Sequence, residues 1–188
     1  MGRKKINPNR IPVSREDYDL EQIKEQATKG MVLQEWAVIL AALANLGGMT
    51  TEKIMDFWRH VDRAPTMIHT FADAEKKLAE IRELTGFALS IQHIDPTIHT
   101  RGDLSRFERV VKANAVATAF AIIAEPMIRE EVLPLDELQI VLQRALSINE
   151  EIADGEISVG DIQEMLRDEY NLRLSNIEDR CTLELVSE

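Results

Sequence analysis

Hydrophobic residues recur at helical spacing over the first third of the chain. Ser14 is followed by acidic residues at the positions of a helix start, which predicts that it caps the first helix. After Gly30 the pattern becomes apolar nearly all round, interrupted by Gln34, Glu35 and Asn45, and this predicts a buried central helix. The apolar positions at helical spacing are Leu20, Ile23, Ala27, Met31, Trp36, Ile39, Leu40, Leu43 and Leu46.

Two more helices are predicted before residue 90. Gly47-Gly48 ends the central helix, and Thr50 or Thr51 caps a second one that stops at Ala64-Pro65. The third extends from Asp73 to Leu84, and Gly86 suits the left-handed residue after its end. The apolar residues of the second helix are Ile54, Phe57, Trp58 and Val61.

The pattern then repeats about 84 positions later. Residues 36–40 (WAVIL) correspond to residues 120–124 (FAIIA), and Gly86 corresponds to Asn171 at an offset of 85. A period of this length indicates two copies of a small unit. Asparagine is the usual non-glycine residue in the left-handed conformation, so we expect Asn171 to end a helix as Gly86 does.

The second copy is predicted to contain three helices as well. The first extends from Leu104 to about Glu131, with a kink or break forced by Pro126. The second extends from Leu135 to Ser147, and Ser158 caps the third. Short strands are predicted after the third helices, at 87–90 and 172–175, and residues 182–186 also alternate like a strand.

These elements predict an all-α fold that is a tandem duplication of a roughly three-helix unit, with short strand pieces after the third helix of each copy. The predicted parts are a basic flexible arm (1–13), a first helical unit (14–90), a linker around Pro96 (91–100), a second helical unit (101–175) and a C-terminal tail (176–188).

Charge is distributed unevenly along the 188 residues, whose net charge is −11. Residues 1–15 hold five basic residues and no acidic one, whereas residues 130–188 hold 16 acidic residues against four arginines. An acidic face repels nucleic acid and attracts cationic partners, including a groove that holds a phosphate backbone. The alternative is that the acidic residues only keep the protein in solution.

The remaining composition excludes several classes. The single cysteine, Cys181, rules out an intramolecular disulfide framework and suits a reducing compartment. The apolar segment 31–46 is interrupted by polar residues, so no transmembrane helix is expected, and we expect a cytoplasmic protein. No phosphate-binding loop, nucleophile elbow or paired-carboxylate motif stands out, which predicts a protein without enzymatic activity or cofactor.

Residues 150–161 (EEIADGEISVGD) resemble the calcium loop of the EF-hand family. Gly155, Ile157 and Asp161 stand at the places of the turn glycine, the apolar residue and the closing acid, and Asp154 fits an oxygen ligand. Glu150 and Ile152 depart from the pattern. The resemblance implies a calcium-binding alternative with Asp154, Asp161 and the backbone carbonyl of Glu156 as ligands.

Two further local patterns contain residue types that are found in metal sites or DNA-binding motifs. His93, Asp95 and His99 are close in sequence, but their spacing is not that of a helical ligand pair, so solvated side chains are expected. Residues 81–94 resemble the turn of helix-turn-helix repressors, yet the segment after the turn has no lysine or arginine. A DNA-binding alternative therefore rests mainly on the basic arm: Arg3, Lys4, Lys5 and Arg10.

A wider resemblance covers the arm and much of the second copy. The segments KINPNRIPVS and VLQRALSINEEIADGEISVGDIQEMLRDEYNLRLS are similar to small proteins encoded by phages and prophages of Gram-positive bacteria. The resemblance supplies no catalytic motif. It implies a protein that is carried by a mobile element and acts on host machinery.

These observations lead to one functional hypothesis. The chain is expected to be a non-enzymatic inhibitor or adaptor whose acidic surface docks on a nucleic-acid groove of a host defence protein, as anti-CRISPR-like proteins do. Whether it forms a homodimer is left open. The expected contact residues are Glu150, Glu151, Asp154, Glu156, Asp161, Glu164 and Asp168.

Overall fold

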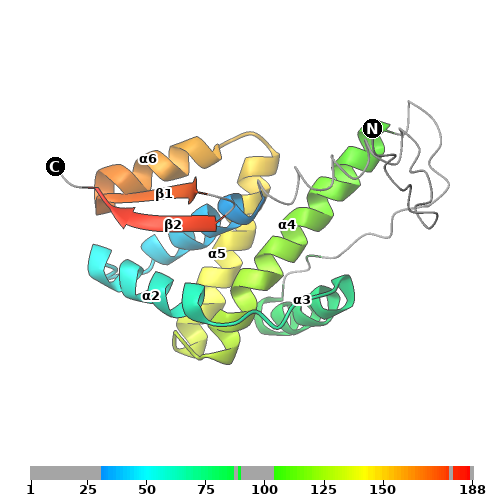
Figure 1. The fold of residues 1–188 in the computed structure, drawn as a ribbon, viewed down its shortest axis with the longest axis horizontal. Helices are drawn as coiled ribbons and strands as arrows, with labels where there is room; N and C mark the ends of the chain where they lie inside the picture. Colours follow the sequence, from blue (N-terminus) through cyan, green and yellow to red (C-terminus); the bar gives the residue numbers. More distant parts are fainter. Residues whose placement is uncertain (1–30, 87–88, 90–103, 178–179, 187–188) are drawn as a thin grey trace, which may run out of the picture.

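The computed structural model describes residues 31–86, 89, 104–177 and 180–186, and within them the fold is mainly helical (Figure 1). A helix of residues Met31–Ala44, called the central helix below, comes first. The labelled elements are α2 (Thr51–Arg63), α3 (Phe71–Thr85), α4 (Leu104–Arg129), α5 (Leu135–Ala153), α6 (Val159–Tyr170), β1 (Leu172–Ile177) and β2 (Arg180–Leu185).

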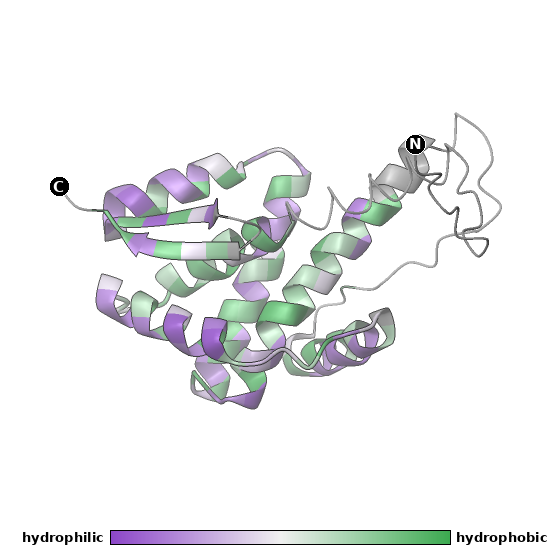
Figure 2. Ribbon diagram, in the orientation of Figure 1, coloured by the Kyte–Doolittle hydropathy of each residue, from purple (hydrophilic) through white to green (hydrophobic). Residues whose placement is uncertain are grey.

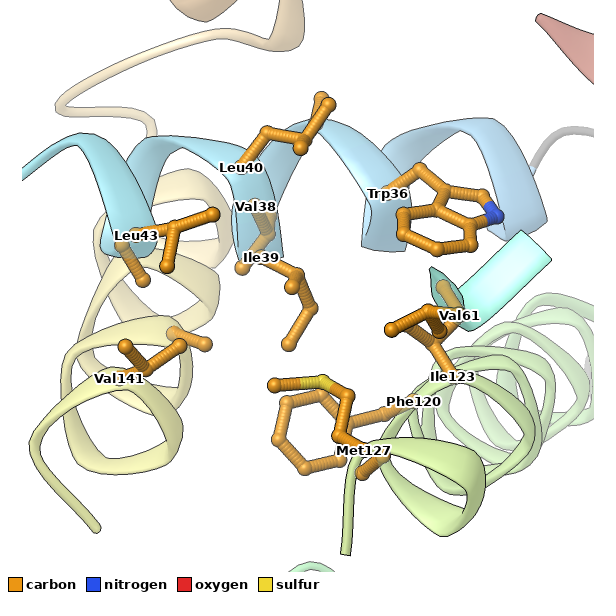
Figure 3. Close-up of a cluster of buried hydrophobic side chains, with 14 of the residues drawn as sticks. Trp36, Val38, Ile39, Leu40, Leu43, Val61, Phe120, Ile123, Met127 and Val141 are labelled. Carbon is orange, nitrogen blue, oxygen red and sulfur yellow. The ribbon is translucent and has the colours of Figure 1, made fainter. Parts of the chain in front are cut away.

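The central helix is buried as predicted. Every residue from Glu35 to Leu43 is less than 9% exposed. Figure 3 shows side chains of this helix facing others from α2, α4 and α5, with Ile39, Phe120 and Met127 close together in the middle. Trp36 packs against Trp58 of α2 with ring centroids 4.2 Å apart. An all-round apolar helix is stable in water only when other helices cover each of its sides, and here they do.

One hydrophobic core joins the two predicted units. A single cluster contains buried hydrophobic residues from both 36–81 and 117–183. Neither set of helices therefore has a core of its own. Figure 2 shows hydrophobic residues concentrated where α4 and α5 pass through the middle, whereas α2 and α6 carry much of the hydrophilic colour. The predicted arm, the capping of a helix by Ser14 and the linker lie outside the described residues.

The helix ends follow from local chemistry. The Thr50 side chain caps α2, and Ser158 forms a capping box with Asp161 at the start of α6. Gly86 and Asn171 both adopt the left-handed conformation, with φ of 76° and 54°. The predictions for Ser158, Gly86 and Asn171 are therefore confirmed, and α5 is longer than the predicted 135–147 because it continues to Ala153.

Helix α4 passes through Pro126 without a break. The residue lies inside the helix, and the backbone N–H of Glu130 still donates to the Pro126 carbonyl at 2.9 Å. A break of the helix at Pro126, one of the two predicted outcomes, is therefore wrong. By length and composition alone, Val110–Arg129 could cross a membrane, which the sequence reasoning overlooked. Of that window, 67% is buried inside the fold.

Strands β1 and β2 form an antiparallel hairpin in which Leu172 lies opposite Leu185 and Leu174 opposite Leu183. Because side chains alternate along a strand, Leu172, Leu174 and Leu183 are buried on one face. The strand predicted at 172–175 is confirmed, and much of the predicted tail belongs to the same hairpin. The matching strand predicted at 87–90 lies outside the described residues, apart from Leu89, which is not in a strand.

Candidate functional site

The predicted contact residues lie along the end of α5, the turn that follows and the first part of α6. This surface, called the acidic edge below, consists of Glu150, Glu151, Asp154, Glu156, Asp161, Glu164 and Asp168. All are exposed except Glu151, which is half-buried. The structure therefore places the seven residues on three consecutive segments.

The turn exists because α5 cannot continue beyond Ala153. Asp154 is its C-cap, and Gly155 adopts a φ of 76°, which side-chain-bearing residues seldom reach. The backbone N–H of Glu156 donates to the carbonyl of Glu151 at 2.9 Å. The chain then changes direction within a few residues, and Ser158 caps the start of α6, which runs across α5 (Figure 1).

Three carboxylates of the acidic edge have partners within the protein. Glu151 pairs with Arg144, and Asp168 accepts from Arg167 Nε at 2.9 Å. Asp161 Oδ2 accepts from both the backbone N–H and the hydroxyl of Ser158, each at 2.7 Å. These hydrogen bonds lower the pKa of Asp161, because they stabilise its ionised form.

The other four carboxylates point to solvent. Glu164 makes no ion pair in the described part of the chain, although its charge helps to raise the pKa of Arg167. Glu150, Asp154 and Glu156, called the free carboxylates below, have neither a hydrogen bond nor an ion pair through their side chains to any described residue. They are consequently the part of the acidic edge that is available to a partner.

The C-terminal end of α5 strengthens the negative potential of the acidic edge. The carbonyl groups at the C-terminal end of a helix carry a partial negative charge, which basic side chains usually offset. The last turn of α5 holds no basic residue, and instead Glu150 and Glu151 occupy it, with Asp154 as the cap. The acidic edge therefore adds carboxylates to a helix end that is already negative.

The structure does not form a calcium loop here. Glu150 and Ile152 belong to α5, so the first half of the resembling segment is helix rather than a cage of oxygen ligands. Asp161 is already engaged by Ser158. Among the residues that the structure describes, no group of three His, Cys, Asp or Glu side chains is placed to hold a metal ion. The structure does not bring Asp154, Glu156 and Asp161 together as ligands.

Sequence reasoning missed a polar cluster around the buried Glu35, between the central helix and α5. Asn149 Nδ2 donates to Glu35 Oε2 at 2.8 Å, and Gln34 Nε2 lies 3.4 Å from both Glu35 Oε1 and Asn149 Oδ1. Glu35 is 0% exposed, and burial raises its pKa to about 7 although both amides favour its ionised form. The interruption of the apolar run by Gln34 and Glu35 was the available signal.

The remaining candidates are structural or lie beyond the described residues. Cys181 is buried, and burial together with the charge of Asp62 raises the pKa of its thiol to about 11, so it is a poor nucleophile. Three other candidates lie outside the described ranges, apart from Leu89. They are the basic arm, the group of His93, Asp95 and His99, and the segment after the turn that resembles helix-turn-helix repressors.

Comparison with protein-family models, with curated proteins and with solved structures finds no match for this chain.

Proposed function

We propose that the protein is a non-enzymatic binding module that presents the acidic edge to a cationic groove of another protein. The observation that carries the proposal is the charge at the end of α5. Acidic side chains are placed where the helix itself is negative. The last turn holds no basic residue, and Arg144, from an earlier turn, pairs with only one of its acids, Glu151. An arrangement that costs local stability is expected where negative charge serves a purpose other than folding.

The free carboxylates are suited to an electrostatic contact. Side chains that already make ion pairs must lose these before they bind a partner, whereas Glu150, Asp154 and Glu156 meet no such cost among the described residues. Cationic grooves that hold nucleic acid are built to receive a row of negative charges. We therefore assign the direct contacts first to these three residues, then to Glu164, and a supporting role to Glu151, Asp161 and Asp168.

The proposed partner is a nucleic-acid-binding protein of the host cytoplasm, in particular a defence nuclease that the chain would block as an anti-CRISPR-like inhibitor. We propose in addition that the chain is carried by a phage or prophage, which would place its target in the host cell. The −12 carried by residues 130–188 supports a cationic target.

The test is an affinity capture from host cells with three forms of the protein as bait. The first is the wild type, and the second carries Glu150→Gln, Asp154→Asn and Glu156→Gln. The matched control has the same change of charge on exposed acids elsewhere: Glu75→Gln, Glu83→Gln and Asp136→Asn.

We expect the wild type and the control to recover a nucleic-acid-binding protein that added DNA or RNA displaces. The variant without free carboxylates should recover much less. Equal recovery by all three forms would show that binding does not depend on the acidic edge.

We also propose that the two halves are tandem duplicates. Capping boxes start α3 and α6, formed by Thr70 with Asp73 and by Ser158 with Asp161, and left-handed residues end both helices. The shared core makes each half dependent on the other. A fragment of residues 98–188 should therefore not unfold cooperatively as a monomer in a thermal melt monitored by circular dichroism.

A further inference from the structure

A groove of about 540 Å³ lies between α6 and β1, beside the acidic edge. Gly160, Gln163, Glu164 and Arg167 line one side, and these positions share one face of α6 because they recur at three- and four-residue intervals. Residues 173–175 of β1 and Val186, which follows β2, line the other side. Figure 1 shows the two elements diverging from their common turn at the C-terminal end of α6.

The outer edge of β1 offers unpaired backbone groups to this groove. The backbone N–H of Val186 donates to the Asn171 carbonyl at 2.8 Å, which makes residues 171 and 186 a hydrogen-bonded pair. Such pairs alternate in an antiparallel ladder, so Arg173 and Ser175 direct their backbone groups toward β2. Leu174 and Asn176 direct theirs away from β2. No backbone hydrogen bond from a described residue reaches that outer edge.

Two arginines and one acidic residue, Glu164, line the groove, which lies in an acidic part of the chain. Two of the four arginines of residues 130–188 line it, Arg167 on the helix and Arg173 on the strand. Arg167 is half-exposed and pairs only with its neighbour Asp168, and Arg173 is exposed and makes no ion pair with a described residue. Guanidinium groups on both sides favour a carboxylate between them.

We propose that this groove binds an extended acidic peptide, which adds to β1 as a third strand. Residues 173–175 span about 10 Å, the length of about three residues of an added strand. The backbone of the peptide pairs with Leu174 and Asn176, and an acidic side chain lies between Arg167 and Arg173. This is the usual way in which an exposed sheet edge recognises a peptide.

The charges also argue against a second copy of this chain as the occupant. Pairing two β1 strands about Leu174 would bring the arginine-lined grooves of both copies together, and like charges at close range oppose such contact. The groove shares Glu164 with the acidic edge, and Asp168 of that edge pairs with Arg167, but the proposal rests on the two arginines and the open edge of β1.

The experiment is selection of a random octapeptide library displayed on phage against the full-length protein. We expect enrichment of peptides rich in Asp and Glu. A synthetic copy of a selected peptide should bind about tenfold more weakly to the double variant Arg167→Gln/Arg173→Gln. The matched control Arg59→Gln/Arg82→Gln removes the same charge from exposed positions outside the groove and should bind normally.

Two further measurements test the backbone contact. A peptide that is N-methylated at alternate residues loses the donors needed for an added strand, and Asn176→Pro removes an outward donor without breaking the ladder to β2. Both changes should abolish binding, with circular dichroism showing that the variant is folded. The proposal is overturned if no peptide is enriched, if acidic residues are not favoured, or if the double variant or the methylated peptide binds unchanged.

Discussion

The buried carboxyl group of Glu35 makes stability depend on pH in a direction opposite to that of most acidic residues. In the folded protein its pKa is raised from 4.5 to about 7, because burial removes water from the charged form. In the unfolded chain the carboxyl group is exposed and ionises at its ordinary pKa. Between these two values only the folded state holds the proton.

The sign and size follow from linkage. A state that binds more protons is stabilised as the pH falls, so the free energy of unfolding should decrease as pH rises from about 4.5 to 7 and level off above that. Each pKa unit corresponds to 1.36 kcal/mol, and the difference for Glu35 therefore amounts to about 3 kcal/mol. That is a sizeable part of the stability of a domain of this size.

The variant Glu35→Gln removes the titration and keeps the shape of the side chain. The free energy of unfolding is measured by urea denaturation at pH 5, 6, 7 and 8. We expect the value for Glu35→Gln minus the value for the wild type to increase by roughly 2 to 3 kcal/mol between pH 5 and pH 8. Subtracting the two curves removes the other titrating groups. The substitution Glu75→Gln removes an exposed carboxyl group and is the matched control. A difference between Glu35→Gln and the wild type that does not change with pH would refute the reasoning.

Four further outcomes are expected. Asn171→Ala should cost about 1 kcal/mol in urea unfolding, because alanine resists the left-handed conformation, whereas Asn171→Gly should be nearly neutral. Ser158→Ala removes the cap of α6 and should cost about 1 kcal/mol in the same assay, and no change would mean that the cap is dispensable. Phe120→Ala should cost about 3 to 5 kcal/mol, with tryptophan fluorescence and circular dichroism reporting one transition, because the core is shared. Cys181 should react with a thiol reagent only after unfolding, and rapid reaction of the native protein would contradict its burial.

Local signals in the sequence predicted the helices and their ends well. The all-round apolar run around Ile39 can be stable only when it is buried, and Thr50, Gly86 and Asn171 act on their own neighbours in the chain. Such features depend on a few adjacent residues, so a single sequence contains the information that determines them.

Contacts between distant segments were not predictable in the same way. The hydrogen bond from Asn149 to Glu35 joins residues 114 positions apart, and no spacing rule connects them. The pairing of β1 with β2 also needed the fold, because the sequence indicated short strands without their register. The break predicted at Pro126 did not occur for a physical reason. Helix α4 loses one backbone donor at this residue, but the core packs against the helix both before and after it.

The acidic edge was predictable only in part. The sequence predicted seven acidic residues near one another, and the structure places them on consecutive segments around one turn. Which of the seven carboxylates make no ion pair or hydrogen bond depends on nearby partners such as Arg144 and Ser158. The fold determines which partners lie within reach, and the composition does not. The resemblance to a calcium loop was misleading because α5 extends six residues beyond its predicted end and includes Glu150.

The central claim is that the free carboxylates carry the interaction with a cationic partner. The most direct measurement is the dissociation constant of the captured partner as a function of sodium chloride concentration, for the wild type, the variant without free carboxylates and the matched control. The account predicts that salt weakens binding of the wild type and the control equally, and that the variant binds more weakly with a smaller dependence on salt. Binding that is independent of salt, or the same affinity for all three proteins, would contradict it.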